Sequence, residues 1–308
     1  MTLPATLARN LALPLIAAPM TGVSGPDLVV AACRAGVIGS FPTHNARTVE
    51  DLDRWLRHVN AETGGAAPFA PNLVVHRTND RLAADVDCLV RHGVELVITS
   101  VGSPAPVLGP LRDAGCLVFA DVATMRHVDR ALDAGADGLV LLTAGAGGQT
   151  GAANPLAFVR AVREVFDGPV VVAGGVSDGA ALLAARVLGA DLCYMGTAFI
   201  ATEESLADDA YRHALVGAGL DDVVQTSVPS GLPANFLRSW WESQPESRTG
   251  QAAPAGGFAH SAALAQRGVW AAGHSVAGVH GVGSVAELVE TISKQYDLAR
   301  SALLESRR

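Results

Sequence analysis

The chain is poor in lysine and in charged residues generally. Lys294 is the only lysine among 308 residues. Schiff-base or lysine-base chemistry would depend on that one residue near the C-terminus, so we exclude it. Charged residues make up 17% of the chain, and the net charge is −8. Because nucleic-acid-binding proteins normally carry a basic face, we expect no nucleic-acid partner.

Long apolar runs are also missing. No stretch of about 18 apolar residues occurs, so we expect no membrane span. The first residues, "MTLPATLARNLALP", lack a basic region followed by a sustained apolar one, and we expect no signal peptide. The four cysteines stand singly in apolar stretches and form no CxxC pair, as is typical of small buried hydrophobes. We therefore expect a cytoplasmic protein with reduced thiols.

Short apolar runs are what the chain has in abundance. Most are nearly continuous rather than alternating, as expected for parallel strands that are buried on both faces. Each is followed by a segment with helical periodicity, and several of these segments end at glycine, the residue favoured just after a helix. The eight runs are residues 13–20, 36–41, 68–75, 95–101, 115–122, 138–144, 168–175 and 191–197.

Eight strand–helix units in about 200 residues predict an α/β fold of the (β/α)8 TIM barrel type. The alternative is a doubly wound open sheet, which would carry a Gly-x-Gly-x-x-Gly turn after its first strand. This chain has "APMTGVSG" there. The pattern therefore favours the barrel.

The chain loses its periodicity after the eighth strand. Residues 202–219 predict an acidic helix, whereas residues 225–270 are rich in proline, glycine and serine yet contain Phe236, Trp240 and Trp241. We interpret residues 1–224 as the barrel, 225–270 as a cap over its mouth, and 271–308 as a C-terminal segment whose helix packs back on the barrel. The alternative for the cap is a contact with a partner, such as a second copy in a homodimer.

Functional residues of such barrels lie where the strands end. Glycines follow the seventh and eighth strands, at Gly174–Gly175 and at Gly196–Thr197, each shortly before a predicted helix. Exposed backbone N–H groups near helix N-termini bind phosphate. We therefore predict a phosphate site at these two loops. Other strand ends supply polar candidates: His44, Asn72, His76 and Asp121.

The loop after the sixth strand reads "TAGAGGQTG" over residues 143–151. Small residues let a backbone approach a ligand closely, and Gln149 is the one long polar side chain in the loop. A flat molecule that reaches from this loop to the phosphate site fits the pattern. Flavin mononucleotide (FMN) has that shape, and we predict it as the cofactor.

The sequence resembles the nitronate monooxygenases, FMN enzymes of the 2-nitropropane dioxygenase type. The resemblance runs through "PLIAAPM", "PNLVVH", "AGAGGQTG", "VVAGGVSDG" and "GADLCYMGTAFIATEE" to "WAAGHSVAGV". It implies oxidation of a small nitronate or nitroalkane by O₂. It also implies ring contacts at Pro19, Met20, Asn72, Ala146 and Gly147, and phosphate contacts at Gly174, Gly175, Gly196 and Thr197. We assign Asp121, by its place at a strand end, to the same cofactor site.

The chain departs from the family at Gln149, because the family usually has a catalytic histidine in this loop. A glutamine amide donates and accepts hydrogen bonds but takes no proton near pH 7. Three interpretations stay open. The substrate arrives as a preformed nitronate that Gln149 holds by hydrogen bonding; or His44 or His76 is the base; or the reaction differs. The last includes an NAD(P)H-dependent flavin enoyl reductase and a flavin-binding protein that has lost catalysis.

Overall fold

A closed barrel of eight parallel strands forms the centre of the molecule. The computed structural model describes residues 3–229, 231–249 and 268–305. Each predicted apolar run contains one barrel strand, in chain order, and β1 pairs with both β2 and β9, which closes the barrel. The predicted fold is therefore confirmed. The strands are β1 (Leu15–Ala17), β2 (Ile38–Pro42), β3 (Phe69–Val74), β4 (Leu96–Ser100), β5 (Leu117–Val122), β6 (Gly138–Leu142), β8 (Val170–Ala173) and β9 (Leu192–Met195).

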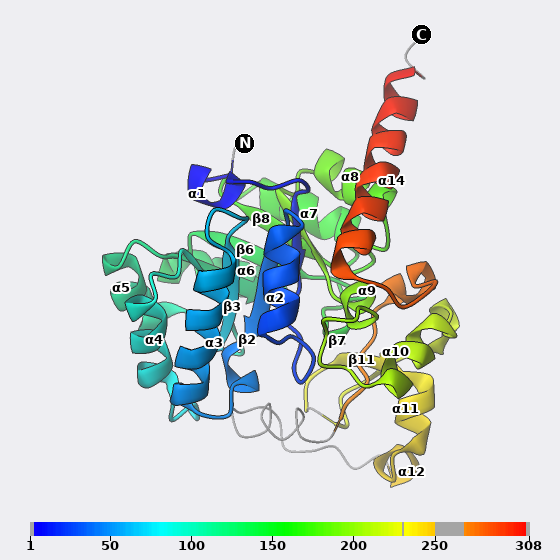
Figure 1. The fold of residues 1–308 in the computed structure, drawn as a ribbon, viewed down its shortest axis with the longest axis horizontal. Coiled ribbons are helices and arrows are strands. Elements are labelled where there is room, and N and C mark those ends of the chain that lie inside the picture. Colours follow the sequence, from blue (N-terminus) through cyan, green and yellow to red (C-terminus); the bar gives the residue numbers. More distant parts are fainter. Residues whose placement is uncertain (1–2, 230, 250–267, 306–308) are drawn as a thin grey trace.

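Helices follow the strands and surround the barrel (Figure 1). Thr48 and Asp51 form the predicted capping box at the start of α3, and Gly135 and Gly189 end α6 and α8 in the left-handed conformation. The helix α5 did not show in the sequence pattern, because Pro110 lies inside it. These helices are α2 (Pro26–Arg34), α3 (Val49–Glu62), α4 (Leu82–Arg91), α5 (Ala105–Asp113), α6 (Met125–Ala134), α7 (Pro155–Arg163), α8 (Gly179–Leu188) and α9 (Thr197–Ile200).

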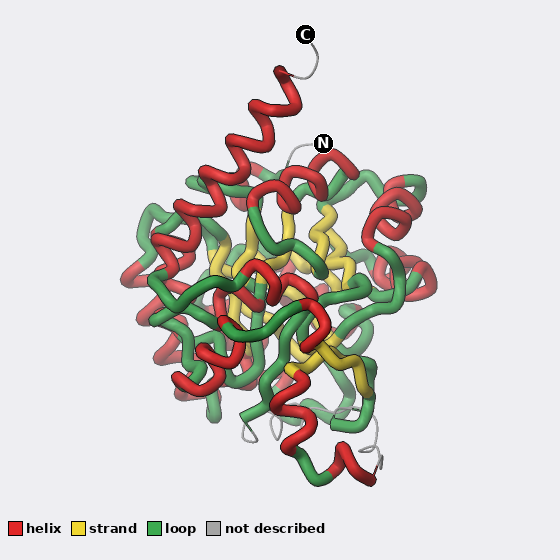
Figure 2. Tube along the Cα trace, turned by 90° about the vertical axis from the view of Figure 1, so that its right-hand side faces the viewer, coloured by secondary structure: helices red, strands yellow, loops and turns green. Residues whose placement is uncertain are grey.

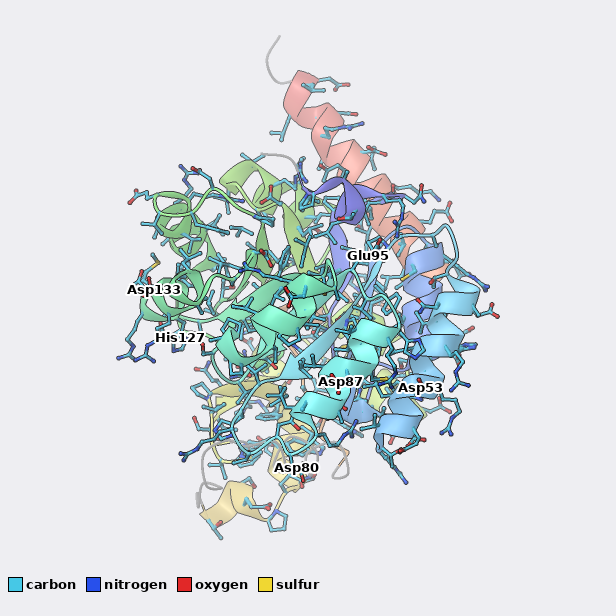
Figure 3. All side chains as sticks on the ribbon, turned by 90° about the vertical axis from the view of Figure 1, so that its left-hand side faces the viewer. Asp53, Asp80, Asp87, Glu95, His127 and Asp133 are labelled. Carbon is cyan, nitrogen blue, oxygen red and sulfur yellow. The ribbon has the colours of Figure 1, made fainter. Side chains whose placement is uncertain are left out.

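The barrel interior is a packed core. Ile16, Ile98 and Phe119 are fully buried there, and Leu7 of the short helix α1 (Ala5–Ala8) belongs to the same cluster. Two further apolar layers lie between the strands and the helices. Charged side chains such as those of Asp87 and Asp133 lie on the outer helices (Figure 3). The filled interior leaves the strand ends as the place for a site.

A small antiparallel sheet lies at the end of the barrel opposite α1 (Figure 1). Its order is β10 (Val223–Thr226), β11 (Ala234–Leu237) and β7 (Gly148–Gln149), so it joins the predicted cap to the glycine loop. The short helices α11 (Arg238–Ser243) and α12 (Glu246–Thr249) follow. The predicted boundary after residue 224 falls inside β10. The three-part division stays a prediction, and residues 250–267 of the cap lie outside the described residues.

The remaining elements complete the barrel surroundings. The predicted acidic helix over 202–219 is shorter than expected: α10 spans Asp209–Val216, starting at the cap residue Asp208. The final helix α14 (Val285–Glu305) packs on α8 and α2 through its first half, and its second half projects from the body (Figures 1 and 2). No helix in the described ranges is long and apolar enough to cross a bilayer. Three short 3-10 helices are η1 (Thr43–Asn45), η2 (Leu220–Asp222) and η3 (His274–Gly278).

Candidate active site

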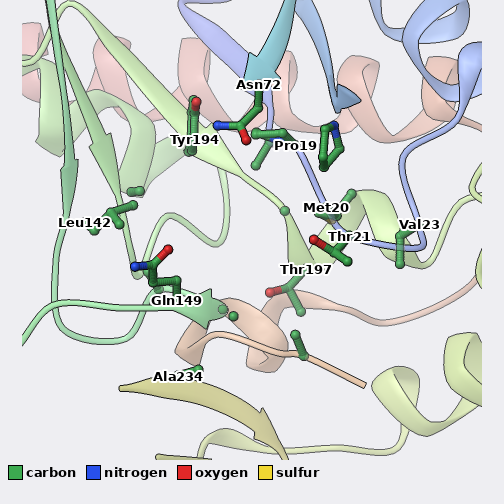
Figure 4. A pocket seen from close by; sticks show the side chains of 18 of the residues that line it. Pro19, Met20, Thr21, Val23, Asn72, Leu142, Gln149, Tyr194, Thr197 and Ala234 are labelled. Carbon is green, nitrogen blue, oxygen red and sulfur yellow. The ribbon is translucent and has the colours of Figure 1, made fainter. Parts of the chain in front are cut away.

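One cavity of about 260 Å³ opens at the carboxyl ends of the barrel strands. It collects residues from nearly every strand end, from the glycine loop and from the cap (Figure 4). Of the predicted site residues, only His76 does not line it. Those that do are Pro19, Met20, His44, Asn72, Asp121, Ala146, Gly147, Gln149, Gly174, Gly175, Gly196 and Thr197.

The glycine loop is bare partly because the C-terminal segment packs against its backbone. A Cβ atom at Gly147 would lie 2.7 Å from the backbone nitrogen of Gly273. The backbone N–H of His274 also donates to the carbonyl of Gly145 at 2.9 Å. Space for a ligand is therefore not the only reason for the small residues in this loop.

The cap holds the same loop from its other side. The buried side chain of Asn235 donates to the carbonyl of Ala146 at 2.7 Å, and β11 pairs with Gln149 through Ala234. Gln149 itself is exposed and extends from β7 into the pocket, with Asn72 and Tyr194 on the far wall (Figure 4). The loop backbone is fixed by hydrogen bonds, while the one long side chain stays available to a ligand.

The glycines after β8 form a cradle. Gly174 and Gly175 both have positive φ, +128° and +74°, and a side chain at Gly175 would point into open space. The start of α8 is already occupied: Asp178 caps it, and the first backbone N–H, at Gly179, donates to Gln295 Oε1 at 3.1 Å. Phosphate would therefore meet the N–H groups of the loop glycines rather than the helix terminus that the sequence suggested.

The two candidate histidines differ. His44 is buried in the pocket wall, and its Nε2 lies 3.1 Å from Thr21 Oγ1. Burial, assisted by the charge of Arg81, lowers the pKa of His44 to about 4, so the ring is neutral at pH 7 and a weak base. His76 instead lies beside Thr78 Oγ1, 2.8 Å from its Nδ1, and away from the pocket lining.

Asn72 and Asp121 provide polar groups on the barrel wall. Ser100 Oγ donates to Asn72 Oδ1 at 3.0 Å, which orients the amide. Asp121 lines the cavity at the end of β5, and burial raises the pKa of its carboxyl to about 8. Both residues lie where a cofactor ring could meet them.

The sequence did not single out several residues that line the pocket. Tyr194 is one of only three tyrosines and stands inside an apolar run, which is a usable signal. Cap residues carried no such signal, because β11 is short and lies outside the strand–helix repeat. The lining residues missed include Thr21, Tyr194, Leu232, Ala234, Phe236, Val269, Ala271 and Ser275.

The predicted aromatic residues of the cap act from behind the pocket wall. Trp240 packs on Phe236 with ring centroids 5.3 Å apart, and only Phe236 of this pair lines the cavity. Next to them, Tyr211 stacks on Trp270 at 5.4 Å, and its hydroxyl donates to the carbonyl of Ala271. These contacts make the cap wall apolar and well packed.

A closed parallel barrel with a glycine-lined pocket at its strand ends defines a cofactor-binding (β/α)8 barrel. The chain matches the model of the nitronate monooxygenase family over residues 6–301, and it belongs to that family.

Three relatives illustrate the range of similar proteins. A nitronate monooxygenase of Paraburkholderia phytofirmans is 29% identical, with 73% of each chain aligned. A protein of Mycobacterium tuberculosis named "(3aS,4S,5R,7aS)-5-hydroxy-7a-methyl-1-oxo-octahydro-1H-indene-4-carboxyl-CoA dehydrogenase" is 30% identical over 73% of this chain and 63% of its own length. The solved structure of nitroalkane oxidase from Streptomyces ansochromogenes has a TM-score of 0.84 at 26% identity, covering 97% of this chain and all of that one.

Proposed function

We propose that this protein is an FMN-dependent oxidoreductase that oxidises a small, preformed nitronate with O₂. Family membership supports flavin chemistry. The observation that carries the rest is Gln149: the one long side chain that the glycine loop sends into the pocket hydrogen-bonds but does not titrate.

The pocket fits FMN on its own evidence. The carboxyl Oδ1 of Asp121 and the hydroxyl of Tyr194 are buried, line the cavity, and have no hydrogen-bond partner within the described residues. Buried polar atoms are normally paired, so a polar ligand is expected to meet them. The cradle at Gly174 and Gly175 is open, as a phosphate requires. FMN would lie between these two ends, with Pro19 and Met20 along its ring.

The residues then take separate roles. When bound, the flavin supplies the electron transfer between substrate and O₂. Gln149 donates an N–H to a nitronate oxygen and orients the substrate. His44, neutral and bonded to Thr21, shapes the pocket wall and takes up little proton at pH 7. No residue with a pKa near 6.5 is placed in the pocket to remove a proton from a neutral nitroalkane.

The alternative, an NAD(P)H-dependent enoyl reductase, is less well supported. Among the described residues, no lysine or arginine lines the pocket. Phosphates of a nicotinamide nucleotide or an acyl carrier would find no cation there, whereas nitronate is small enough to be held by an amide.

Oxygen uptake tests the proposal. The purified protein should carry a flavin spectrum and consume O₂ with propylnitronate, with much less consumption for neutral nitropropane. NADH oxidation in the absence of nitronate would favour the reductase instead. A flavin-loaded protein that reacts with neither would mean that catalysis has been lost, and a colourless protein that binds no added FMN would contradict the cofactor assignment.

A further inference from the structure

Asp121 and Tyr194 face the same cavity from opposite parts of the barrel. Asp121 ends β5, Tyr194 belongs to β9, and both side chains point into the barrel mouth. Tyr194 is 8% exposed and packs in the interior cluster. Its hydroxyl and Asp121 Oδ1 lack hydrogen-bond partners in the described part of the chain. Two orphaned polar groups that share a cavity point to one ligand that bonds to them.

The charges around Asp121 are unusual for a carboxyl group. The other titratable side chains that line the cavity in the described ranges are His44, Tyr194 and Tyr211. His44 is neutral at pH 7 because its pKa is lowered to about 4. Burial raises the pKa of Tyr194 well above its usual value, and the nearby Asp121 raises it further. Tyr211 donates its hydroxyl proton to the carbonyl of Ala271.

No positive charge therefore faces Asp121 from the cavity lining. A buried carboxylate without a cation is costly, and the group keeps its proton instead. The direction agrees with the pKa of about 8 that burial gives this carboxyl. At pH 7 the group is mainly a neutral acid, which can donate a hydrogen bond.

We propose that Asp121 is a proton-holding acid that donates its O–H to the bound flavin and so makes the reduction of the flavin depend on its own protonation. This inference rests on the proposed function, because it needs a flavin in the pocket. It concerns the tuning of the cofactor and is independent of the substrate.

The balance of charge gives the expected behaviour. Two electrons and one proton convert the oxidised flavin to its anionic reduced form. A neutral Asp121 tolerates that negative charge, whereas an ionised Asp121 opposes it. Above the pKa of Asp121, reduction therefore draws a second proton from water, which binds to the carboxylate.

Redox equilibration against a reference dye, from about pH 7 to pH 9.5, tests the proposal on the flavin-loaded protein. In the wild type, the equilibrium constant for reduction should fall tenfold per pH unit at first. Above about pH 8 it should fall by up to a further tenfold per unit, because one more proton is taken up. Asp121→Asn keeps the shape and cannot ionise, so its constant should fall tenfold per unit throughout.

Cofactor affinity provides a second readout that needs no redox chemistry. FMN binding to the apoprotein, followed by quenching of flavin fluorescence, should weaken up to tenfold per pH unit above about pH 8. It should not weaken in this way in Asp121→Asn. Identical pH profiles for the two proteins would overturn the proposal. So would an affinity that rises through pH 8, because an ionised carboxylate would then be the group that binds.

An infrared measurement on the wild type covers the case of a misfolded variant. A carboxylic acid C=O stretching band should be present at pH 7, should shift when the flavin is reduced, and should disappear above about pH 8. A band that does not respond to flavin reduction would overturn the proposal. If FMN binds normally but the profiles do not differ, only this inference fails; if neither protein binds FMN, the proposed function fails and takes this inference with it.

Discussion

The two walls of the pocket differ in chemistry and in how they are built. The barrel wall presents amide, carboxyl and hydroxyl groups from Asn72, Asp121 and Tyr194, with the Gly174–Gly175 cradle beside them. The cap wall presents the apolar side chains of Leu232, Phe236 and Val269. We infer that the barrel wall binds the cofactor and that the cap wall selects the substrate. Gln149 stands where they join, because β7 pairs with β11 of the cap.

This comparison predicts separable effects: changes on the barrel wall should alter flavin binding or reduction, and changes on the cap wall should alter only the substrate range. The largest effect is expected at the cradle. Gly175→Asp would place a carboxylate beside the phosphate, and the purified protein should lose essentially all its flavin. Gly175→Ala, which strains the backbone equally at φ +74° but adds no charge, should retain more. The ratio of flavin to protein absorbance measures both. Full occupancy in the aspartate variant would place the phosphate elsewhere.

At the junction of the walls, the expected effect is a gain. Gln149→His introduces a group that can accept a proton near pH 7, and general-base assistance typically contributes about 10²–10⁴-fold. Turnover of neutral nitropropane should therefore rise in the variant, with a new pH limb near the histidine pKa of about 6.5. Oxygen uptake across pH checks this. No gain with neutral substrate would mean that the loop position lies outside reach of the substrate carbon.

Removing the amide should cost less. Gln149→Ala deletes one hydrogen bond to a charged substrate, about 1.5–3 kcal/mol, so propylnitronate turnover should drop by roughly tenfold to a hundredfold. His76→Ala is the matched control and should leave turnover unchanged, because His76 does not line the pocket. If Gln149→Ala is silent while His44→Ala or His76→Ala removes activity, the base lies on an earlier strand end.

A cap-wall change should be smaller still. Leu232 is half-buried and lines the cavity, so Leu232→Ala removes apolar contact without opening the core. We expect KM for propylnitronate to rise by about tenfold or less, as one to two buried methylene groups are worth. The flavin content should not change. Loss of flavin in this variant would show that the two walls do not divide the work as inferred.

The smallest effect concerns stability. The folded-state pKa of Asp121, about 8, lies above the ordinary value of 3.8. The native apoprotein therefore holds a proton that the unfolded chain releases, and stability falls as the pH rises from about 4 to 8. Asp121→Asn removes this penalty and should stabilise the apoprotein by about 1–3 kcal/mol at pH 7, with little gain at pH 4. Urea unfolding at the two pH values measures the difference, and an equal effect at both would contradict the raised pKa.

The barrel wall could be predicted from sequence because each of its residues follows a recognisable apolar run. Asn72, Asp121 and Gly174 were identified in this way, since the carboxyl ends of parallel strands converge. The same rule also selected His76, whose side chain turns aside to Thr78. Position after a strand decides which end of the barrel a residue occupies, and local hydrogen bonds decide where its side chain points.

The cap wall could not be predicted, because its contacts are long-range. Asn235 binds the carbonyl of Ala146, 89 residues away, and Gly273 meets Thr197 Oγ1 across 76 residues. No periodicity marks such pairs. The composition of the loop at 143–151 suggested a flat ligand, yet the backbone of Gly273 explains part of it. A bare loop can be shaped by its own chain as well as by a ligand.

The account's central claim is that Gln149 holds an already deprotonated substrate and transfers no proton. Anaerobic bleaching of the bound flavin by propylnitronate and by neutral nitropropane, measured across pH in the wild type, tests it most directly. We predict bleaching by nitronate with no limb near pH 6.5, and bleaching by nitropropane at least a hundredfold slower at pH 7. Equal rates for the two substrates, or a limb near pH 6.5 that disappears in His44→Ala, would contradict the claim.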